Sequence, residues 1–422
     1  MQLQKPKLFP ERKGFMLVMG MLILLLSIRL FFAYHTYQNF ISKPFYYTYA
    51  KVIVAYEKNK GGRYYTVLKL KSDEGFTFYT TTHRKENFNH KRLRLQIFPN
   101  KSIKFRDYLG TFYVKSKIKH QEKVDVTFKN NVLNKVASQH KSTALQSFYN
   151  AIFFASPLDK NLREQIAKLG ISHLVALSGF HLGILWGLLY GVLLLFYRPM
   201  QQKFFPYRHA LFDVGFVAML LLGLYVWFVG FPPSLVRSYA MVLVGWGVLL
   251  LGMELLSFTF LTMVLFMLVV LFPSLLVSLS FWLSVTGVFY IFLLLQYTKA
   301  FDTKLISLLF IPFGIFLLML PVVHGIFGLT TPYQLLSPLL SILFVPFYPL
   351  VILLHVLGIG DIFDNALLWL FSLPKESLEH FLPVWLVGVY MGLSMGAIWN
   401  KKVFYVVLGL AAAYSIYLFT YI

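Results

Sequence analysis

Apolar stretches long enough to cross a lipid bilayer recur along most of this 422-residue sequence. A transmembrane helix needs roughly 20 consecutive, mainly apolar residues. Only 13% of the residues are charged, whereas 58% are hydrophobic and 18% are aromatic. Soluble surfaces rarely tolerate so few charges. The sequence therefore predicts an α-helical polytopic membrane protein with about ten spans.

The positions of the apolar stretches give the predicted spans. We place them at Phe15–Ala33, Leu174–Tyr197, Ala210–Gly230, Leu235–Leu251, Leu256–Phe272, Leu275–Tyr297, Leu305–Leu320, Val384–Ile398 and Val403–Tyr421. Another apolar stretch, 335–357, contains three prolines, which remove backbone donors and kink helices. A simple span there would put Lys401 and Lys402 outside, so we expect a broken or re-entrant element, or else an extra crossing through 362–373.

The first span sets the expected orientation. Four cations precede it, at Lys5, Lys7, Arg12 and Lys13. They favour a cytoplasmic amino end, so that the chain from Tyr34 onward emerges on the outer face of the membrane. The stretch is too long for a signal-peptide core and no small-residue cleavage site follows it, so we expect it to be retained.

A strongly basic block follows this span. Between Tyr34 and Leu145 stand 22 Lys and Arg against 7 Asp and Glu, a net +15 of the chain's +22. A long exported segment can override the positive-inside tendency, so an outer location remains open to this block. Its charge indicates an anionic partner.

Short alternating stretches inside the block predict β-strands. Apolar residues alternate with polar ones in three places, at Leu68 and Leu70, at Leu93, Leu95 and Ile97, and at Val124, Val126 and Phe128. The pair Gly61-Gly62 suits a hairpin turn. The strands fit an inserted small β-barrel or sandwich with one apolar and one basic face, and an oligonucleotide-binding barrel is the natural candidate.

Aromatic residues are interleaved with the cations of this block. Bases stack on such rings while Lys and Arg follow the phosphates of a single strand. The candidate DNA-binding residues are Lys51, Arg63, Tyr64, Tyr65, Lys69, Lys71, Arg92 and Arg94. A basic face that touches anionic lipid head groups is the alternative, and composition leaves both open.

Two short helices are predicted between the basic block and the membrane part. The first covers Ala144–Ala155. The second is expected to begin with Ser156 as its N-cap, Pro157 at N1 and Asp159 at N3, and to stop at Gly170. Both are too short or too charged to cross a bilayer.

The stretch 173–191 carries a glycine at every fourth position. Gly179, Gly183, Gly187 and Gly191 would leave one helix face nearly bare, and Gly388, Gly392 and Gly396 repeat the pattern. Small residues let helices approach closely, so helix packing is their expected role.

Polar side chains stand in the same predicted helix. Ser178 and His181 would share one face, with His173 about 80° round from His181. Polar groups in a membrane are costly unless paired or hydrated, so hydrogen-bonded structural roles are favoured over chemistry. Farther on, Ser234 is expected to cap a helix in which Arg237 is either an interfacial anchor or a cation facing a polar path.

These two segments resemble the ComEC competence family. The run His173-Leu174-Val175-Ala176-Leu177-Ser178-Gly179-Phe180-His181-Leu182-Gly183 is similar to the "HLLAISGLHVG" signature that opens the family's membrane domain. The family's "PSxxRA" segment resembles Pro233-Ser234-Leu235-Val236-Arg237, with Ser238 in place of Ala. A later "P…LSF" pattern looks like Pro273 with Leu283-Ser284, although the spacing differs. The resemblance covers about Ala144 to Leu350.

The resemblance implies a channel that passes single-stranded DNA across the inner membrane, with an exported oligonucleotide-binding domain ahead of it. It also implies two partners, a periplasmic DNA-binding competence protein and a cytoplasmic helicase or motor that pulls DNA. The expected division is 1–33 tail and first span, 34–143 basic domain, 144–172 junction helices and 173–422 channel.

One expected departure concerns chemistry. Many members of the family end in a metallo-β-lactamase-like domain, whereas this sequence stops at Ile422 inside its last predicted span, and none of its histidines forms an HxHxDH cluster. No catalytic residue, metal or cofactor is therefore expected in this polypeptide.

Two rival functions remain open. A lipid or glycan transporter would share the spans and a basic outer domain. An intramembrane serine protease would use Ser178 with His324 or His355 as a remote base, although Ala176 replaces the usual first glycine of its motif.

Overall fold

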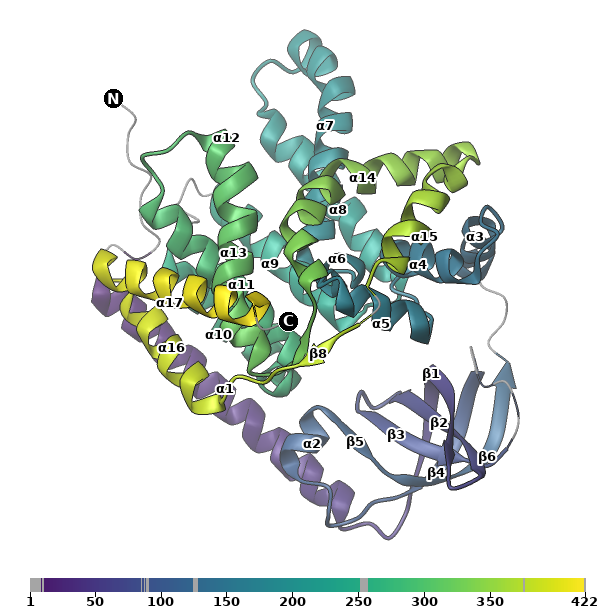
Figure 1. The fold of residues 1–422 in the computed structure, drawn as a ribbon. Coiled ribbons are helices and arrows are strands. Elements are labelled where there is room, and N and C mark those ends of the chain that lie inside the picture. The colour runs from purple at the N-terminus through teal and green to yellow at the C-terminus, as the bar shows by residue number, and fades with distance from the viewer. Residues whose placement is uncertain are drawn as a thin grey trace. The chain divides into compact units, whose positions relative to one another are not determined.

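The computed structural model describes residues 9–420 except 10, 85, 87, 89–90, 124–127, 251–256 and 375. These described residues are mostly helical and fall into two compact units. The smaller unit comprises Phe9–Asn130 and Thr262–Phe281. The larger unit is built from Asn131–Leu261 and Trp282–Ile422. Figure 1 shows the helices and strands of which the two units consist.

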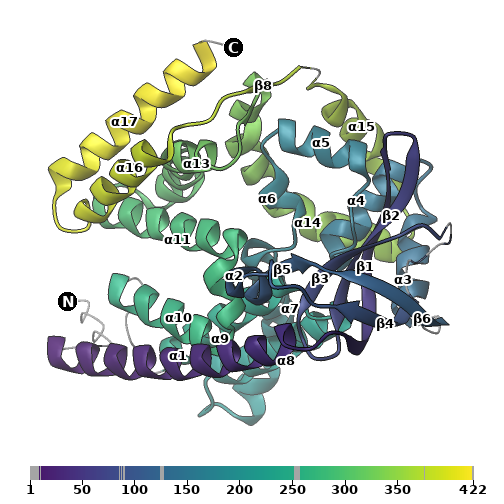
Figure 2. The ribbon, with the colours of Figure 1, turned by 90° about the horizontal axis from the view of Figure 1, so that it is seen from below.

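The smaller unit contains one long helix and a six-stranded sheet. Helix α1, Arg12–Ile41, is continuous well beyond the predicted end of the first span, and Figure 2 shows it as one unbroken purple helix. The strands are β1 (Tyr46–Lys60), β2 (Arg63–Ser72), β3 (Thr77–Thr82), β4 (Lys91–Phe98), β5 (Thr111–Tyr113) and β6 (Lys115–Lys123), with helix α2 (Phe105–Leu109) before β5.

One segment of the chain forms the strands at both borders of the sheet. Its order is β5-β3-β2-β1-β4-β6, and every pair is antiparallel except β3 with β5. Strands β5 and β6 are separated only by Val114, so one chain segment pairs with β3 at one border and with β4 at the other. The hydroxyl oxygens of Thr80 on β3 and Ser116 on β6 are also 2.8 Å apart. The two borders are therefore connected through a single residue.

The predicted hairpin turn is confirmed. Strands β1 and β2 are joined by Gly61 and Gly62 alone, and their φ angles are +59° and +78°. A two-residue turn with both φ angles positive has the twist of the flanking strands, and glycine adopts it without a steric penalty.

The core of the smaller unit uses the predicted alternation. Leu68 and Leu70 are fully buried, as are Leu93, Leu95 and Ile97. Two positions of the third predicted strand, Val124 and Val126, lie outside the described residues. Phe128 begins helix α3 (Phe128–Ala137), so its assignment to a strand is wrong.

Among the described residues after β6, fifteen α-helices follow. They are α3, then α4 (Thr143–Phe154), α5 (Lys160–Lys168), α6 (Ser172–Val175), α7 (Gly179–Phe204), α8 (Ala210–Val229), α9 (Pro233–Leu250), α10 (Phe258–Leu271), α11 (Leu279–Tyr297), α12 (Thr303–Leu305), α13 (Ile311–His324), α14 (Ser337–Leu357), α15 (Asp364–Ser372), α16 (Val384–Gly396) and α17 (Lys401–Thr420). Short helices at Pro273–Val277, Ile306–Phe310, Pro332–Leu336 and Gly360–Phe363 lie between them.

Many of these helices have the length and composition of membrane spans. Within the described residues, seven helical stretches qualify: Arg12–Ile41, Gly179–Phe204, Ala210–Val229, Leu279–Tyr297, Thr303–His324, Pro332–Leu357 and Lys401–Thr420. Shorter apolar helices cover Ser234–Leu250, Phe258–Leu271 and Val384–Gly396. The molecule thus combines several candidate membrane helices with a small amino-terminal sheet.

Two short paired strands lie on either side of residues 331–377, the segment whose membrane topology the sequence left open. Strands β7 (Leu329–Thr330) and β8 (Leu378–Glu379) pair antiparallel. Between them run α14 and α15, and α15 has nine residues, about 14 Å of helix, which is too short to cross a bilayer alone. The chain therefore leaves and returns at one place. The prolines at 346 and 349 do not break α14, which is continuous around them.

The junction helices form, but the predicted cap of the second is wrong. Helix α5 begins at Lys160, and its N-cap is Asp159, whose carboxylate accepts hydrogen bonds from the backbone N–H groups of Asn161 and Leu162. Ser156 stands three residues before this N-cap, so its hydroxyl is not in the capping position that the Asp159 carboxylate occupies. Gly170, at φ +70°, follows the helix end as predicted.

Candidate functional site

The signature segment breaks the helix that the sequence predicts there. Helix α6 ends at Val175, Ser178 has extended backbone angles, and α7 starts at Gly179. Ser178 is therefore the N-cap of α7, and His181 is its third residue rather than a neighbour on a helix face. The His181 Nδ1 atom accepts a hydrogen bond from the Ser178 N–H at 3.3 Å. Serine favours this turn because its hydroxyl can satisfy a free amide of the helix start.

His181 is fully buried against α14. Its ring centroid lies 5.1 Å from that of Phe344 and 4.9 Å from that of Tyr348, with both rings edge-on. The Tyr348 hydroxyl in turn donates a hydrogen bond to the carbonyl of Ile152 on α4, at 3.2 Å. The Nε2 atom of His181 has no hydrogen-bond partner among the described residues. The signature histidine thus joins the start of α7 to α14 and, through Tyr348, to a junction helix.

The two family-like segments meet at Gly179. A Cβ at this glycine would lie 3.2 Å from the Ser238 hydroxyl oxygen on α9. Ser238 donates a hydrogen bond to the carbonyl of Ser234 at 2.9 Å, one turn earlier. Ser234 therefore lies within α9, which begins at Pro233, and its predicted role as the cap is wrong. Arg237, on the same helix, is 8% exposed, so its side chain is buried in the protein.

The rest of the glycine stripe does not pack as predicted. A Cβ at Gly183, Gly187 or Gly191 would meet no atom of the described residues within 4 Å. Gly388 and Gly392 are equally open. The prediction of close helix contact is therefore wrong for these positions. At Gly179, the first glycine of the stripe, a side chain would collide with α9.

His173 lies beside α14 as well. Its Nε2 atom is 3.3 Å from the Ser341 hydroxyl oxygen. Each histidine that a protease would use as a base is engaged elsewhere. His324 contacts Thr330 and the carbonyl of Leu320, and both ring nitrogens of His355 are also hydrogen-bonded. The contact of Ser178 is with His181 instead.

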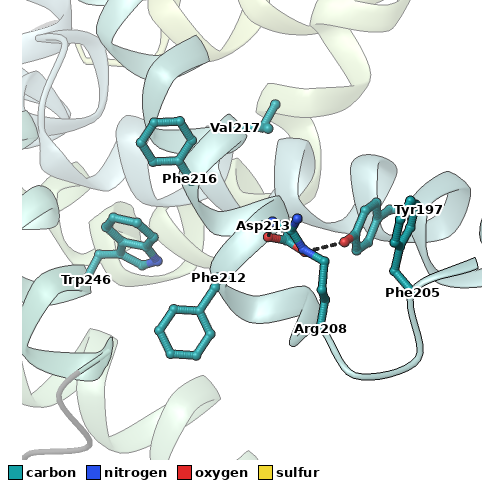
Figure 3. Close-up of a pocket in the computed structure, with 8 residues that line it drawn as sticks. All are labelled: Tyr197, Phe205, Arg208, Phe212, Asp213, Phe216, Val217 and Trp246. Carbon is teal, nitrogen blue, oxygen red and sulfur yellow. Dashed lines mark hydrogen bonds and ion pairs between the residues drawn. The ribbon is translucent and has the colours of Figure 1, made fainter. Parts of the chain in front are cut away.

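A cavity of about 540 Å³ lies between the facing ends of α7 and α8, away from the signature residues. Its polar wall is formed by Asp213, which accepts hydrogen bonds from the Tyr197 hydroxyl and from the Arg208 guanidinium, where Nε is 2.8 Å from a carboxylate oxygen. Figure 3 shows Tyr197 and Arg208 converging on Asp213, with Phe212, Phe216 and Trp246 along the apolar side. The side chains of Tyr197, Arg208 and Asp213 bind one another, whereas the Trp246 Nε1 atom has no hydrogen-bond partner among the described residues.

In the smaller unit, the sheet register gathers the predicted cations. Lys51 on β1 is paired with Lys71 on β2 and with Arg92 on β4, so three cations stand abreast on one face. Directly opposed like charges destabilise a sheet. Arg92 is relieved by an ion pair with Asp73, and the hydrogen bond to Asp73 raises the pKa of Arg92. Among the described residues, neither lysine has such an ion pair.

Aromatic rings share this face, and they are those of Tyr47 and Tyr49 rather than of the candidates Tyr64 and Tyr65. Tyr49 and Tyr47 alternate with Lys51 along β1 and are 37% and 47% exposed. The guanidinium of Arg94 lies 5.8 Å from each of these ring centroids, and that of Arg92 is 5.0 Å from Tyr49. Exposed rings beside cations are the arrangement on which bases stack.

The remaining candidates lie farther along the strands. The ammonium of Lys69 is 5.6 Å from the Tyr79 ring. Tyr64 and Tyr65 pair with Asn59 and Lys58 at the hairpin end, beyond a register shift in β1. Arg63 begins β2, and its side chain is outside what the structure describes.

The described part of the chain has no group of three or more His, Asp or Glu that could hold a metal ion. The apolar helices define a multi-pass membrane protein. Residues 154–419 match the family model described as competence protein. Because this match covers more than half of the sequence, the chain belongs to the competence protein family, as the signature predicts, and this membership supports a role in DNA uptake during competence. No curated protein and no solved structure matches the chain.

Proposed function

We propose that this protein is the inner-membrane channel through which single-stranded DNA enters the cytoplasm during natural transformation. The family match over the helical part carries the proposal. It is supported by the seven long apolar helices and by the exposed cations of the amino-terminal sheet. The channel would receive its strand from a periplasmic DNA-binding protein and pass it to a cytoplasmic motor.

We further propose that the sheet is an oligonucleotide-binding barrel on the outer face. The parallel pairing of β3 with β5 supports a closed barrel. It would have five strands, because β5 and β6 are separated by a single residue and together count as one strand. Lys51 and Lys71 would contact phosphates, because an anion would remove the repulsion between these neighbours. Tyr47 and Tyr49 would stack on bases.

The decisive experiment follows labelled DNA in a strain that lacks the protein. DNA should still arrive in the periplasm while none enters the cytoplasm, and transformation should be lost. Complementation with the full chain should restore entry. Normal cytoplasmic entry in the deletion strain would refute the channel.

The sheet's partner is tested on the full chain in nanodiscs. It should bind a single-stranded oligonucleotide more tightly than an abasic phosphate polymer of equal charge. Preference for anionic lipid over both polymers would favour the lipid-facing alternative and a transporter of another cargo.

A further inference from the structure

A buried polar chain connects three segments of the larger unit that are far apart in sequence. The Nδ1 atom of His140 lies 2.9 and 3.1 Å from the two carboxylate oxygens of Asp364. The Nε2 atom of His140 lies 2.9 Å from Nε2 of His355, and Nδ1 of His355 lies 2.6 Å from the carbonyl oxygen of Val351. The His140 side chain is fully buried, and His355 is 6% exposed.

Hydrogen-bond accounting fixes how many protons this chain must hold. A carbonyl oxygen can only accept, so His355 carries a proton on Nδ1. If His355 is otherwise neutral, its Nε2 accepts, and His140 must donate from Nε2. The remaining contact, between His140 Nδ1 and Asp364, then needs one more proton. That proton makes either an imidazolium facing a carboxylate or a carboxylic acid facing a neutral ring.

Without this additional proton, one contact brings two lone pairs together. It would be either the Nε2–Nε2 contact or the Nδ1–carboxylate contact, both about as short as a hydrogen bond. Placing the imidazolium on His355 instead of His140 changes which atom carries the proton but not the number. The observed distances therefore require one proton beyond those of two neutral histidines and an ionised Asp364.

We propose that Asp364, His140 and His355 form a proton-binding site that fastens the α14–α15 segment to the turn between α3 and α4. Gln139 adds neutral hydrogen bonds across the same interface. Its side chain donates to the His355 carbonyl at 3.1 Å and accepts from the Gly360 N–H at 2.9 Å. Release of the proton to water removes one link, while the neutral links remain.

The surroundings contain few other titratable groups. The Tyr149 ring of α4 stacks on His140, with centroids 4.3 Å apart and an angle of 9° between the planes. Lys141 directly follows His140, and Asp361 stands three residues before Asp364, but both side chains are exposed. No metal is implied, since the three groups form a line rather than converging on one point.

The site is positioned to influence the signature histidine. His355 lies near the end of α14, and the same helix carries Phe344 and Tyr348, which enclose His181. A change in how the end of α14 is held thus reaches the start of α7 through one helix. This proposal does not depend on what passes through the membrane.

The test is the pH dependence of thermal unfolding of the full chain in nanodiscs. Above about pH 7.5 both histidines are mostly neutral in the unfolded chain. The folded protein still holds the additional proton there, so from that pH upward stability should fall as pH rises. Asp364→Asn can donate its amide N–H to His140 Nδ1, which satisfies every contact without that proton. This variant should unfold at nearly the same temperature from about pH 7.5 to pH 9.5, whereas the wild type should lose about 3 °C over the same range.

Asp361→Asn is the matched control and should behave as the wild type does. Equal pH dependence in the wild type and in Asp364→Asn would overturn the proposal. If Asp364→Asn does not fold, a second measurement leaves the site intact. The chain contains no cysteine, so spin labels can be placed at Lys141→Cys and Ile362→Cys, both exposed positions. The distribution of distances between them should be narrow at about pH 7.5 and broaden at about pH 9.5, and an unchanged distribution would contradict proton-dependent fastening.

Discussion

The basic face of the sheet and the signature region of the membrane unit solve opposite problems with polar side chains. On the sheet, Lys51 and Lys71 are neighbours with like charge and lie at the surface, where salt and ligands reach them. In the signature region, His181 is enclosed by aromatic rings and is fully buried. The first arrangement is improved by an external anion, whereas the second depends on packing within the chain. Substitutions should therefore alter affinity in the sheet and folding in the signature region.

The largest effect is expected from His181→Ala. Removing a buried ring leaves a cavity and typically costs about 3 to 5 kcal/mol of stability. It also removes the acceptor for the Ser178 amide. Thermal unfolding in nanodiscs and transformation frequency should both fall sharply. His173→Ala, at an exposed position, should change the unfolding temperature and the transformation frequency only a little. Equal losses in the two variants would show that burial does not distinguish the two histidines.

Gly179→Leu is expected to come next. Even a Cβ at this position would be only 3.2 Å from the Ser238 oxygen, and overpacking usually costs about 1 to 3 kcal/mol. Gly183→Leu is the control on the same helix, because its Cβ would meet open space in the described structure. Protein level and uptake should drop for the first variant only. A loss with Gly183→Leu as well would point to a surface that another molecule covers.

The next effect, on affinity rather than on folding, is expected when Tyr47 and Tyr49 are both changed to Leu. Each stacked base contributes about 1 to 3 kcal/mol, so affinity for single-stranded DNA should fall at least tenfold at constant salt. The folded state should be unaffected, since both rings are partly exposed. Tyr64 with Tyr65 changed in the same way forms the comparison, because these rings lie at the hairpin end. A greater loss from that pair would move the binding surface to the hairpin.

The smallest effect concerns the salt dependence of binding. Lys51→Gln with Lys71→Gln should flatten the slope of log affinity against log salt by about 1.4, since each phosphate contact contributes about 0.7. Arg92→Gln should flatten it less, because Asp73 already neutralises that guanidinium. Titrations at several salt concentrations distinguish the two, and an equal change would mean that the ion pair opens when DNA binds.

Local patterns predicted the local structure well. The Gly61-Gly62 turn and the alternation at Leu68 and Leu93 depend on residues next to one another, so the sequence contains what determines them. The break before Gly179 was missed because Leu, Val and Ala around it also favour helix. Only the capping by Ser178 and the burial of His181 distinguish the two outcomes.

Such local patterns did not predict contacts between segments that are far apart in the sequence. His140 and His355 are 215 residues apart, and neither stands in a motif that would connect them. Tyr47 and Tyr49 were among the aromatic residues of the block, but only the strand register places them beside Arg94 and Lys51. An Asp soon after a histidine at a helix end, as with Asp364 after His355, is a signal that a search for buried partners could have used.

The connection of the two sheet borders through Val114 decides how this domain can meet an extended partner. An open sheet presents a row of unpaired amides and carbonyls that recruits a further strand, including strands of other proteins. Here one chain segment occupies both borders, so the backbone is already committed. A long polymer that passes over these two borders would therefore meet side chains rather than free backbone groups, and such contacts can be released stepwise as the polymer moves on.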